Sequence, residues 1–303
     1  MTAAGESLEA SDPVRKGGQE VELVVDRTNR VVLAAEHERR AAHAGDVREQ
    51  FEAGVLAADE VEHHVEGPQG ARPSCYQRGY GDSDKPRGVA AYDVDRLGDD
   101  FAALIVALGH DAAAVAAHDW GGGVAWNLAI RHPDRVRRLA VIDTPHPDAG
   151  RVPSMQEDNT VNWFRTYFQV PWLPEWSARI GHWWLLSKTM RDSAAPGTFP
   201  EEKLALYRSA WDREGAFGTM VNWYRAAFRK PTPTEPVGSR RVAIPTLLIL
   251  APDDVFIPGS LTRASLQFLD DGRLIELDTG THWVIQERPA EIAALLAEFF
   301  AAP

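Results

Sequence analysis

Cysteine is nearly absent from this chain, and long apolar runs are absent altogether. The single cysteine, Cys75, excludes an internal disulfide and a cysteine-based metal cluster. No apolar stretch approaches the roughly 20 residues that a membrane-spanning helix needs. The polar, acidic N-terminus also has no apolar core of a signal peptide. We therefore expect a cytoplasmic protein with no membrane partner.

Basic residues are in deficit, because 32 Lys and Arg residues stand against 44 Asp and Glu residues and give a net charge of −12. This balance argues against nucleic acid or an anionic membrane surface as a partner. The chain has 303 residues, of which 44% are hydrophobic and 25% charged, as in an ordinary globular protein. The length fits one large domain, or one domain with an inserted lid.

Strands and helices alternate from about residue 77 onward, a pattern typical of α/β folds. One apolar helical face lies between residues 92 and 110, and its helix is predicted to end at Gly109. A second helix begins at the glycines after Asp119 and runs to about Arg131. Buried strands are predicted at 112–117, 138–144, 244–254 and 272–283, and an amphipathic helix at 289–300.

The alternation breaks between about residues 151 and 240, where tryptophan and proline are frequent. A helical subdomain that uses tryptophan as core filler is one interpretation. We favour a lid over an apolar pocket, because such aromatic density in an insertion between strands suits a ligand site. The tryptophans are Trp163, Trp172, Trp176, Trp183, Trp184, Trp211 and Trp223.

Residues 1–76 form an atypical N-terminal segment of uncertain fold. The stretch 21–67 is rich in Ala, Glu and Arg and is compatible with two short helices, the second beginning at Leu56. We expect the tandem His63 and His64 on a solvated helix face, because no third metal ligand lies at helical spacing. We expect neither a metal nor a cofactor in this protein.

Three ionisable residues, Asp119, Asp254 and His282, each follow a predicted strand. Open α/β sheets build their sites at the carboxyl ends of their strands. Nucleophile, acid and histidine is also the chain order of the α/β-hydrolase triad. Asp119 is followed by Trp120 and three glycines, which is typical of a strained strand-to-helix turn that displays one side chain.

Structural alternatives accompany each of these residues. Asp119 is also placed to cap the helix that follows it. Asp253 and Asp143 compete with Asp254 for the role of the acid. We interpret His118 as structural and expect its side chain to point away from the site.

Six motifs carry a resemblance to a known family. From residue 77 to 301 the chain resembles the soluble epoxide hydrolases of the α/β-hydrolase superfamily, in a branch shared with haloalkane and haloacetate dehalogenases. The resemblance implies a mostly parallel sheet with helices on both faces, divided into core 77–150, helical lid 151–240 and core 241–303. It also implies an acid four residues before a proline, here Pro258. The motifs are RGYGDSDKP (78–86), HDWGG (118–122), DTPHP (143–147), YFQVPWLPEW (167–176), NWYR (222–225) and GTHWVIQERP (280–289).

An aspartate nucleophile suits attack on saturated carbon. A carboxyl group with a reference pKa near 3.9 is ionised at neutral pH and needs no base to attack. Attack on a carbon that bears an epoxide oxygen or a halide gives an ester, which water activated by His282 then hydrolyses while Asp254 holds the imidazole. The backbone N–H of Trp120 would be one oxyanion donor. We therefore predict an epoxide hydrolase that acts on a small apolar epoxide and water.

The group that receives the leaving atom separates the two enzymes of this branch. Epoxide hydrolases of the family use two lid tyrosines, and Tyr224 matches one of them. Phe164, three residues before Tyr167, stands where the other is expected. A halide needs only N–H donors, such as the Trp120 indole, so a haloalkane or haloacetate dehalogenase stays an alternative.

Aromatic residues are also predicted to line the substrate pocket, namely Phe164, Tyr167, Trp223 and Trp283. A third hypothesis is a catalytically weak, hydrolase-like protein that binds ligands without turning them over.

The N-terminal segment departs from the family. The family carries three strands and a His-Gly-x-Pro loop before the RGYG motif, and that loop supplies the second oxyanion N–H. Residues 1–76 contain no His-Gly pair. Our hypothesis is that these strands are missing, through a reading-frame error or gene fusion upstream of about residue 77, and that activity is impaired.

Overall fold

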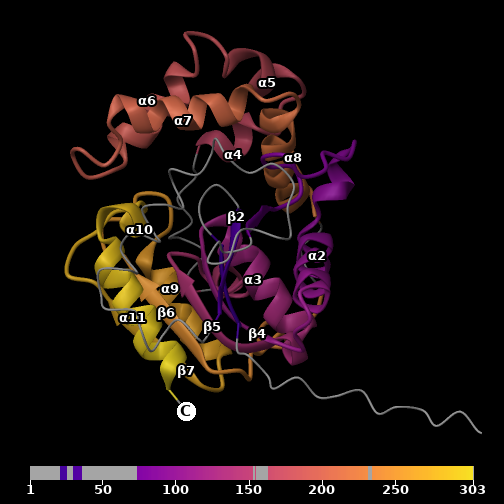
Figure 1. Ribbon diagram of the computed structural model, residues 1–303, viewed down its shortest axis with the longest axis vertical. Helices are drawn as coiled ribbons and strands as arrows, with labels where there is room; N and C mark the ends of the chain where they lie inside the picture. Colours follow the sequence, from indigo (N-terminus) through magenta and orange to yellow (C-terminus); the bar gives the residue numbers. More distant parts are fainter. Residues whose placement is uncertain are drawn as a thin grey trace, which may run out of the picture.

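The computed structural model describes residues 21–25, 30–35, 74–152, 154, 163–230 and 234–302. These residues build a seven-stranded sheet with helices on both faces, and a further group of helices lies above it (Figure 1). Strand β2 pairs antiparallel with β1 and β3, and the other neighbours pair in parallel, which confirms the mostly parallel α/β fold. In spatial order the strands are β3 (Ser74–Tyr76), β2 (Arg30–Ala35), β1 (Val21–Val25), β4 (Ala113–His118), β5 (Val136–Ile142), β6 (Thr246–Leu250) and β7 (Gly272–Glu276).

Both faces of the central strands are buried, and alternate residues pack into different apolar clusters. Val115 and Leu139 face the cluster that includes α2 (Val94–Ala107) and α3 (Trp120–Arg131). Their chain neighbours Ala116 and Ala140 face the cluster of α11 (Pro289–Ala301). Successive side chains along each strand point to opposite faces, so both faces of the central strands are buried under helices. None of the described helices is long and apolar enough to cross a membrane.

The predicted elements of the core are confirmed, with shorter strands near the carboxyl ends. Helix α2 ends next to Gly109, whose φ of 85° suits only glycine without strain. Strand β6 stops at Leu250 and β7 at Glu276, before the residues predicted as their last. The remaining residues are loops at the carboxyl ends of these strands. Short helical elements complete the core: η2 (Val89–Tyr92), η3 (Pro133–Arg135), η4 (Ala149–Arg151), α9 (Gly259–Ser265), η6 (Leu266–Phe268) and α10 (Val284–Glu287).

The N-terminal segment corrects two expectations. Residues 21–25 and 30–35 form β1 and β2 rather than a helix, and β1 pairs with β4 in the register Leu23↔Val115. Valine recurs in both segments, and β-branched residues favour strands over helices. Strands therefore do precede the RGYG motif, and the hypothesis that they are missing is wrong. The predicted second helix, with His63 and His64, lies outside the described residues.

Five of the described α-helices lie between β5 and β6 and group above the sheet, in the region predicted as a lid (Figure 1). We call this group the lid; its role and its boundaries at 151 and 240 stay a prediction. The lid has its own apolar clusters, in which Trp183 is 1% exposed. Its tryptophans differ in their surroundings. Trp172, Trp176 and Trp184 are exposed, Trp211 lines a cavity, and Trp163 lines the cavity while half of its surface is exposed. The helices are α4 (Trp163–Tyr167), α5 (Leu173–Ser177), α6 (Trp184–Asp192), α7 (Glu201–Asp212) and α8 (Ala216–Arg229).

A buried carboxylate ties the two connections of the lid together. Asp148, which follows β5, is fully buried and accepts hydrogen bonds from Arg151 and from Arg240 on the returning chain. The N–H of Gly238 also donates to it, at 3.1 Å. Burial by itself would raise the pKa of Asp148, but the hydrogen bonds from the two arginines lower it.

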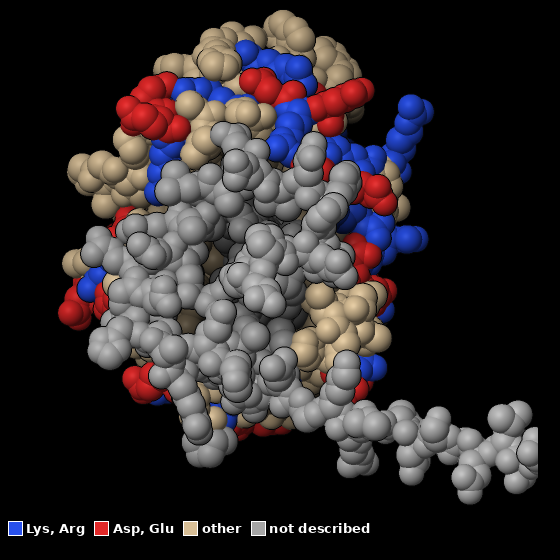
Figure 2. All heavy atoms as spheres, viewed as in Figure 1, with Lys and Arg blue, Asp and Glu red and all other residues tan. Residues whose placement is uncertain are grey.

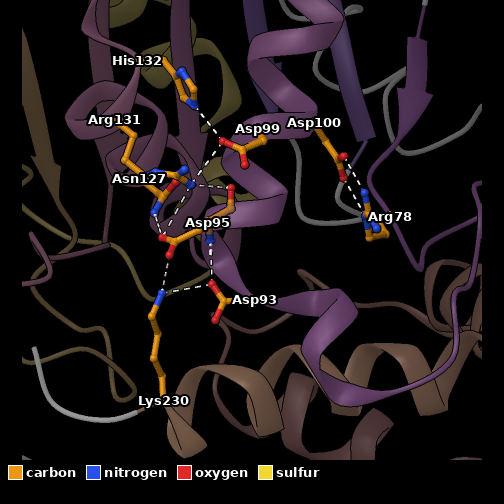
Figure 3. A network of polar contacts seen from close by, with 9 residues as sticks. All are labelled: Arg78, Asp93, Asp95, Asp99, Asp100, Asn127, Arg131, His132 and Lys230. Atoms are coloured by element: carbon orange, nitrogen blue, oxygen red, sulfur yellow. Dashed lines mark hydrogen bonds and ion pairs between the residues drawn. The ribbon is translucent and has the colours of Figure 1, made fainter.

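A second network joins the last lid helix to the core (Figure 3). Lys230, directly after α8, contacts Asp93 at 3.0 Å and Asp95 at 2.7 Å, both at the start of α2. Asn127 of α3 donates to Asp95 at 2.7 Å. Beside it, Arg78 forms a two-pronged pair with Asp100. On the described part of the face in Figure 2, acidic and basic side chains lie next to one another.

We expect Asp148→Ala to lower the free energy of unfolding by about 3–5 kcal/mol, because it leaves two arginines without their buried partner. Urea titration followed by tryptophan fluorescence measures the change. Lys188→Ala is the matched control: it breaks an exposed lid pair with Asp192 and should cost only about 0–1 kcal/mol. Equal losses in the two variants would contradict the role given to Asp148.

Candidate active site

Asp119 lies in the turn between β4 and α3 with φ 52° and ψ −126°. This left-handed region is strained for a residue other than glycine. Asp119 occupies the cap position of α3, yet its side chain makes no capping hydrogen bond. The Thr144 hydroxyl donates to the carbonyl of Asp119 at 3.0 Å and holds the turn from β5. The turn therefore displays the carboxylate instead of using it as a cap.

His282 stands between two carboxylates. Its Nδ1 lies 2.6 Å from Oδ2 of Asp254, and its Nε2 lies 3.6 Å from Oδ1 of Asp119. The side chains of His282 and Asp254 are 6% and 1% exposed, whereas that of Asp119 is 39% exposed. Because an ionised carboxylate only accepts hydrogen bonds, we assign the Nδ1 proton to the contact with Asp254, and Nε2 is the ring nitrogen that faces Asp119.

Backbone amides fix the orientation of Asp254. Its Oδ1 accepts the N–H of Phe256 at 2.7 Å and of Ile257 at 3.0 Å, so its Oδ2 is left for His282. The competing acids face elsewhere. Asp253 accepts from the N–H of Gly280 at 3.2 Å, and Asp143 accepts from the N–H of Ala251 at 2.7 Å.

A cavity of about 430 Å³ lies between the carboxyl edge of the sheet and the lid. Its volume is in the range of small-molecule sites, and aromatic and aliphatic side chains dominate its walls. Asp119 and His282 reach it from the core. The predicted site residues among its lining are Asp119, Trp120, Phe164, Tyr167, Tyr224, His282 and Trp283.

Tyr224 of α8 is held over the turn at Asp119 by edge-to-face ring contacts. Its ring centroid lies 4.7 Å from that of Trp120 and 5.8 Å from that of Phe164. Phe256 completes the enclosure, 6.0 Å from Phe164 and 5.0 Å from His282. Sequence reasoning missed Phe256, although its place two residues after Asp254 put it at the same sheet edge.

Trp223 corrects the predicted pocket. It is 1% exposed and is not among the residues that line the cavity. Its indole N–H donates to the carbonyl of Arg78 at 3.1 Å, and its ring packs 5.3 Å from Tyr80. Adjacent residues on an α-helix point about 100° apart, so α8 turns Tyr224 to the cavity and Trp223 to the core.

His118 corrects a second expectation. It lines the cavity, and its ring centroid lies 4.9 Å from that of His282. Strand alternation would send the side chains of neighbouring residues to opposite faces. The chain turns sharply at Asp119, directly after His118, so alternation ends there.

Comparisons with known proteins identify the family of this chain. Residues 77–171 match the alpha/beta hydrolase fold family model. The AB hydrolase superfamily protein YfhM of Bacillus subtilis is 36% identical over 225 residues, which cover 74% of this chain and 78% of that protein. The chain belongs to the α/β-hydrolase superfamily. Within it, the chain is an epoxide hydrolase-like α/β hydrolase, as the sequence resemblance implied.

The relatives include proteins named as epoxide hydrolases. Epoxide hydrolase 2 of Caenorhabditis elegans is 29% identical over 229 residues, which cover 73% of this chain but only 64% of that protein. The fold is also that of the epoxide hydrolase of Bacillus megaterium in complex with an inhibitor. That structure gives a TM-score of 0.66 at 21% identity, over 84% of this α/β hydrolase and 89% of its own chain.

Two neighbouring glycines of the nucleophile turn provide a stability test. A Cβ at Gly122 would meet the Thr144 hydroxyl at 2.5 Å, whereas one at Gly123 would meet nothing within 4 Å. We expect Gly122→Ala to lower the free energy of unfolding by about 1–3 kcal/mol through overpacking. Gly123→Ala should raise it by up to about 1 kcal/mol, because alanine favours the helix. Thermal unfolding of both variants measures the difference, and equal effects would contradict the packing of Thr144 against the turn.

Proposed function

We propose that this α/β hydrolase opens an epoxide by adding water through a covalent ester of Asp119. The observation that carries the proposal is the line Asp119–His282–Asp254 at the floor of an apolar cavity, with Tyr224 above it. A nucleophile that is already ionised and a hydroxyl that donates a hydrogen bond are the two groups that ring opening requires.

In the first step, an oxygen of the Asp119 carboxylate attacks one epoxide carbon. A carbon–oxygen ester bond forms, the ring carbon–oxygen bond breaks, and its electron pair stays on the departing oxygen. The Tyr224 hydroxyl donates its proton to this developing alkoxide and is left as a tyrosinate. No base is needed at Asp119, because the carboxylate attacks in its ionised form.

In the second step, His282 Nε2 takes a proton from water, and the hydroxide attacks the ester carbonyl carbon of Asp119. The tetrahedral intermediate collapses, the ester bond breaks, and the diol leaves with its proton returned from His282. The Asp119 carboxyl group then gives up its proton, which passes through solvent to the Tyr224 tyrosinate and restores both groups. Asp254 keeps the Nδ1 proton in place and stabilises the imidazolium. The backbone N–H of Trp120, at the start of α3, donates to the oxyanion.

Asp119 and His282 act in different steps, so their variants should differ in a visible way. With His282→Gln the ester forms but is not hydrolysed, and the intact mass should rise by the mass of one epoxide. Asp119→Asn should give no adduct and no diol. Residues 1–76 contain no His-Gly pair to supply the second oxyanion N–H that the family resemblance implies. We therefore expect hydrolysis in the unmodified chain to be about 10²–10³-fold slower than with two donors, so that the ester accumulates transiently. Rapid-quench mass spectrometry follows the adduct; brisk diol formation by Asp119→Asn would contradict the covalent route.

Tyr224→Phe removes the leaving-group donor and should lower epoxide turnover about 10²–10³-fold, the usual loss for one oxyanion-type donor. The release of bromide from a bromoalkane should not change, because a halide leaves without a proton. Tyr207→Phe is the matched control, since this tyrosine lines the same cavity but accepts a hydrogen bond from Gln286 at 2.7 Å. It should keep epoxide turnover.

A dehalogenase is the second candidate, and one observation favours it. Phe164 presents a ring instead of a second hydroxyl opposite Tyr224. Halide release that exceeds epoxide turnover, and that survives Tyr224→Phe, would assign this activity instead. A binding protein without turnover is separated from both by Asp119→Asn, which would then leave ligand affinity unchanged and have no turnover to remove.

A further inference from the structure

One charged side chain of the cavity is neither used by the proposed reaction nor paired with a described carboxylate. Among the described residues, three with formal charge line the cavity: Asp119, Arg165 and Arg213. Asp119 faces His282, and Arg213 pairs with Asp82 at 2.8 Å. Among the described residues, no carboxylate lies within ion-pair distance of the Arg165 guanidinium. Its described contact is instead with an aromatic ring, because it lies 5.2 Å over the centroid of Phe228.

The partly buried surroundings of Arg165 disfavour its positive charge. Burial lowers the pKa of its guanidinium, against an opposing influence of Tyr224. Arginine nevertheless keeps its charge at any physiological pH. A desolvated charge without a counter-ion is costly, and an anion that binds beside it recovers part of that cost.

Arg165 lies close to the reaction centre but not in it. It directly follows Phe164 on α4, and the Phe228 ring beneath it stacks on Tyr224 at 6.5 Å. The guanidinium is therefore one aromatic ring away from the hydroxyl that receives the leaving group. Apolar walls lie between the two positions. Such a cavity suits a ligand with a reactive end, an apolar body and an anionic group.

We propose that Arg165 binds a carboxylate of the substrate and selects epoxides whose apolar body carries such a group. The proposal rests on the proposed epoxide-opening function for the identity of the reactive end. Arg165 touches neither Asp119 nor His282 in any described contact, so it acts on specificity and not on bond breaking. A planar guanidinium matches the two oxygens of a carboxylate.

The kinetic test uses two substrates of equal length, an ω-epoxy fatty acid and its primary amide. Wild-type kcat/KM should favour the acid, and Arg165→Met should reduce that preference roughly 10–100-fold, the range for a hydrogen-bonded charge. Arg165→Lys should retain part of the preference. Arg179→Met is the matched control: it removes a lid arginine that lies over Trp183 and does not line the cavity.

A binding measurement separates this proposal from the proposed function. Calorimetry with decanoate and decanamide, neither of which carries an epoxide, should show tighter binding of decanoate to the wild-type chain but not to Arg165→Met. Equal affinities for the two ligands would overturn the role of Arg165, even with epoxide turnover intact. A decanoate preference that depends on Arg165 in a chain that opens no epoxide would support the anion site and refute the reaction. Circular dichroism of each variant confirms folding, and Arg165→Gln provides a second neutral replacement.

Discussion

The backbone of Asp119 is held at positive φ between β4 and α3, and the rest of the site is arranged around this turn. Such a conformation costs about 1–3 kcal/mol and persists only where neighbouring structure enforces it. Here the enforcement comes from the buried strand before it and from the Thr144 hydroxyl. Because the turn sits at the carboxyl edge of a parallel sheet, the loops after β6 and β7 bring Asp254 and His282 to the same place.

The lid supplies what the sheet edge lacks. The loops of the core deliver charge and a proton acceptor, whereas the lid helices deliver the hydroxyl of Tyr224, the apolar wall of Phe164 and the guanidinium of Arg165. Its two connections meet at the buried Asp148, and Lys230 joins its last helix to α2. The residues of these charged contacts do not line the cavity, so they hold the lid without placing competing ions beside Asp119.

Predictions from local sequence patterns were wrong where contacts with a distant part of the chain set the conformation or the direction of a side chain. The N-terminal stretch is rich in Ala, Glu and Arg, a composition that favoured a helix. The valine-rich segment 21–25 instead pairs in parallel with the edge of β4 as a strand. Trp223 and Tyr224 were equal as aromatic neighbours in the sequence, and only the packing of α8 against the core separates them. His118 obeyed strand alternation until the next residue turned the chain.

The sequence by itself determined the order of the core elements from residue 77 onward, the strand-end positions of Asp119, Asp254 and His282, and the resemblance to epoxide hydrolases. These features are local, since periodicity, turn residues and motif spacing are read within short windows. Only the tertiary structure decided which aspartate faces His282, which aromatic residues meet across the cavity, and which arginine has no acidic partner among the described residues. Those distances join residues far apart in the chain, and the side-chain packing that sets them leaves no signal in any single segment.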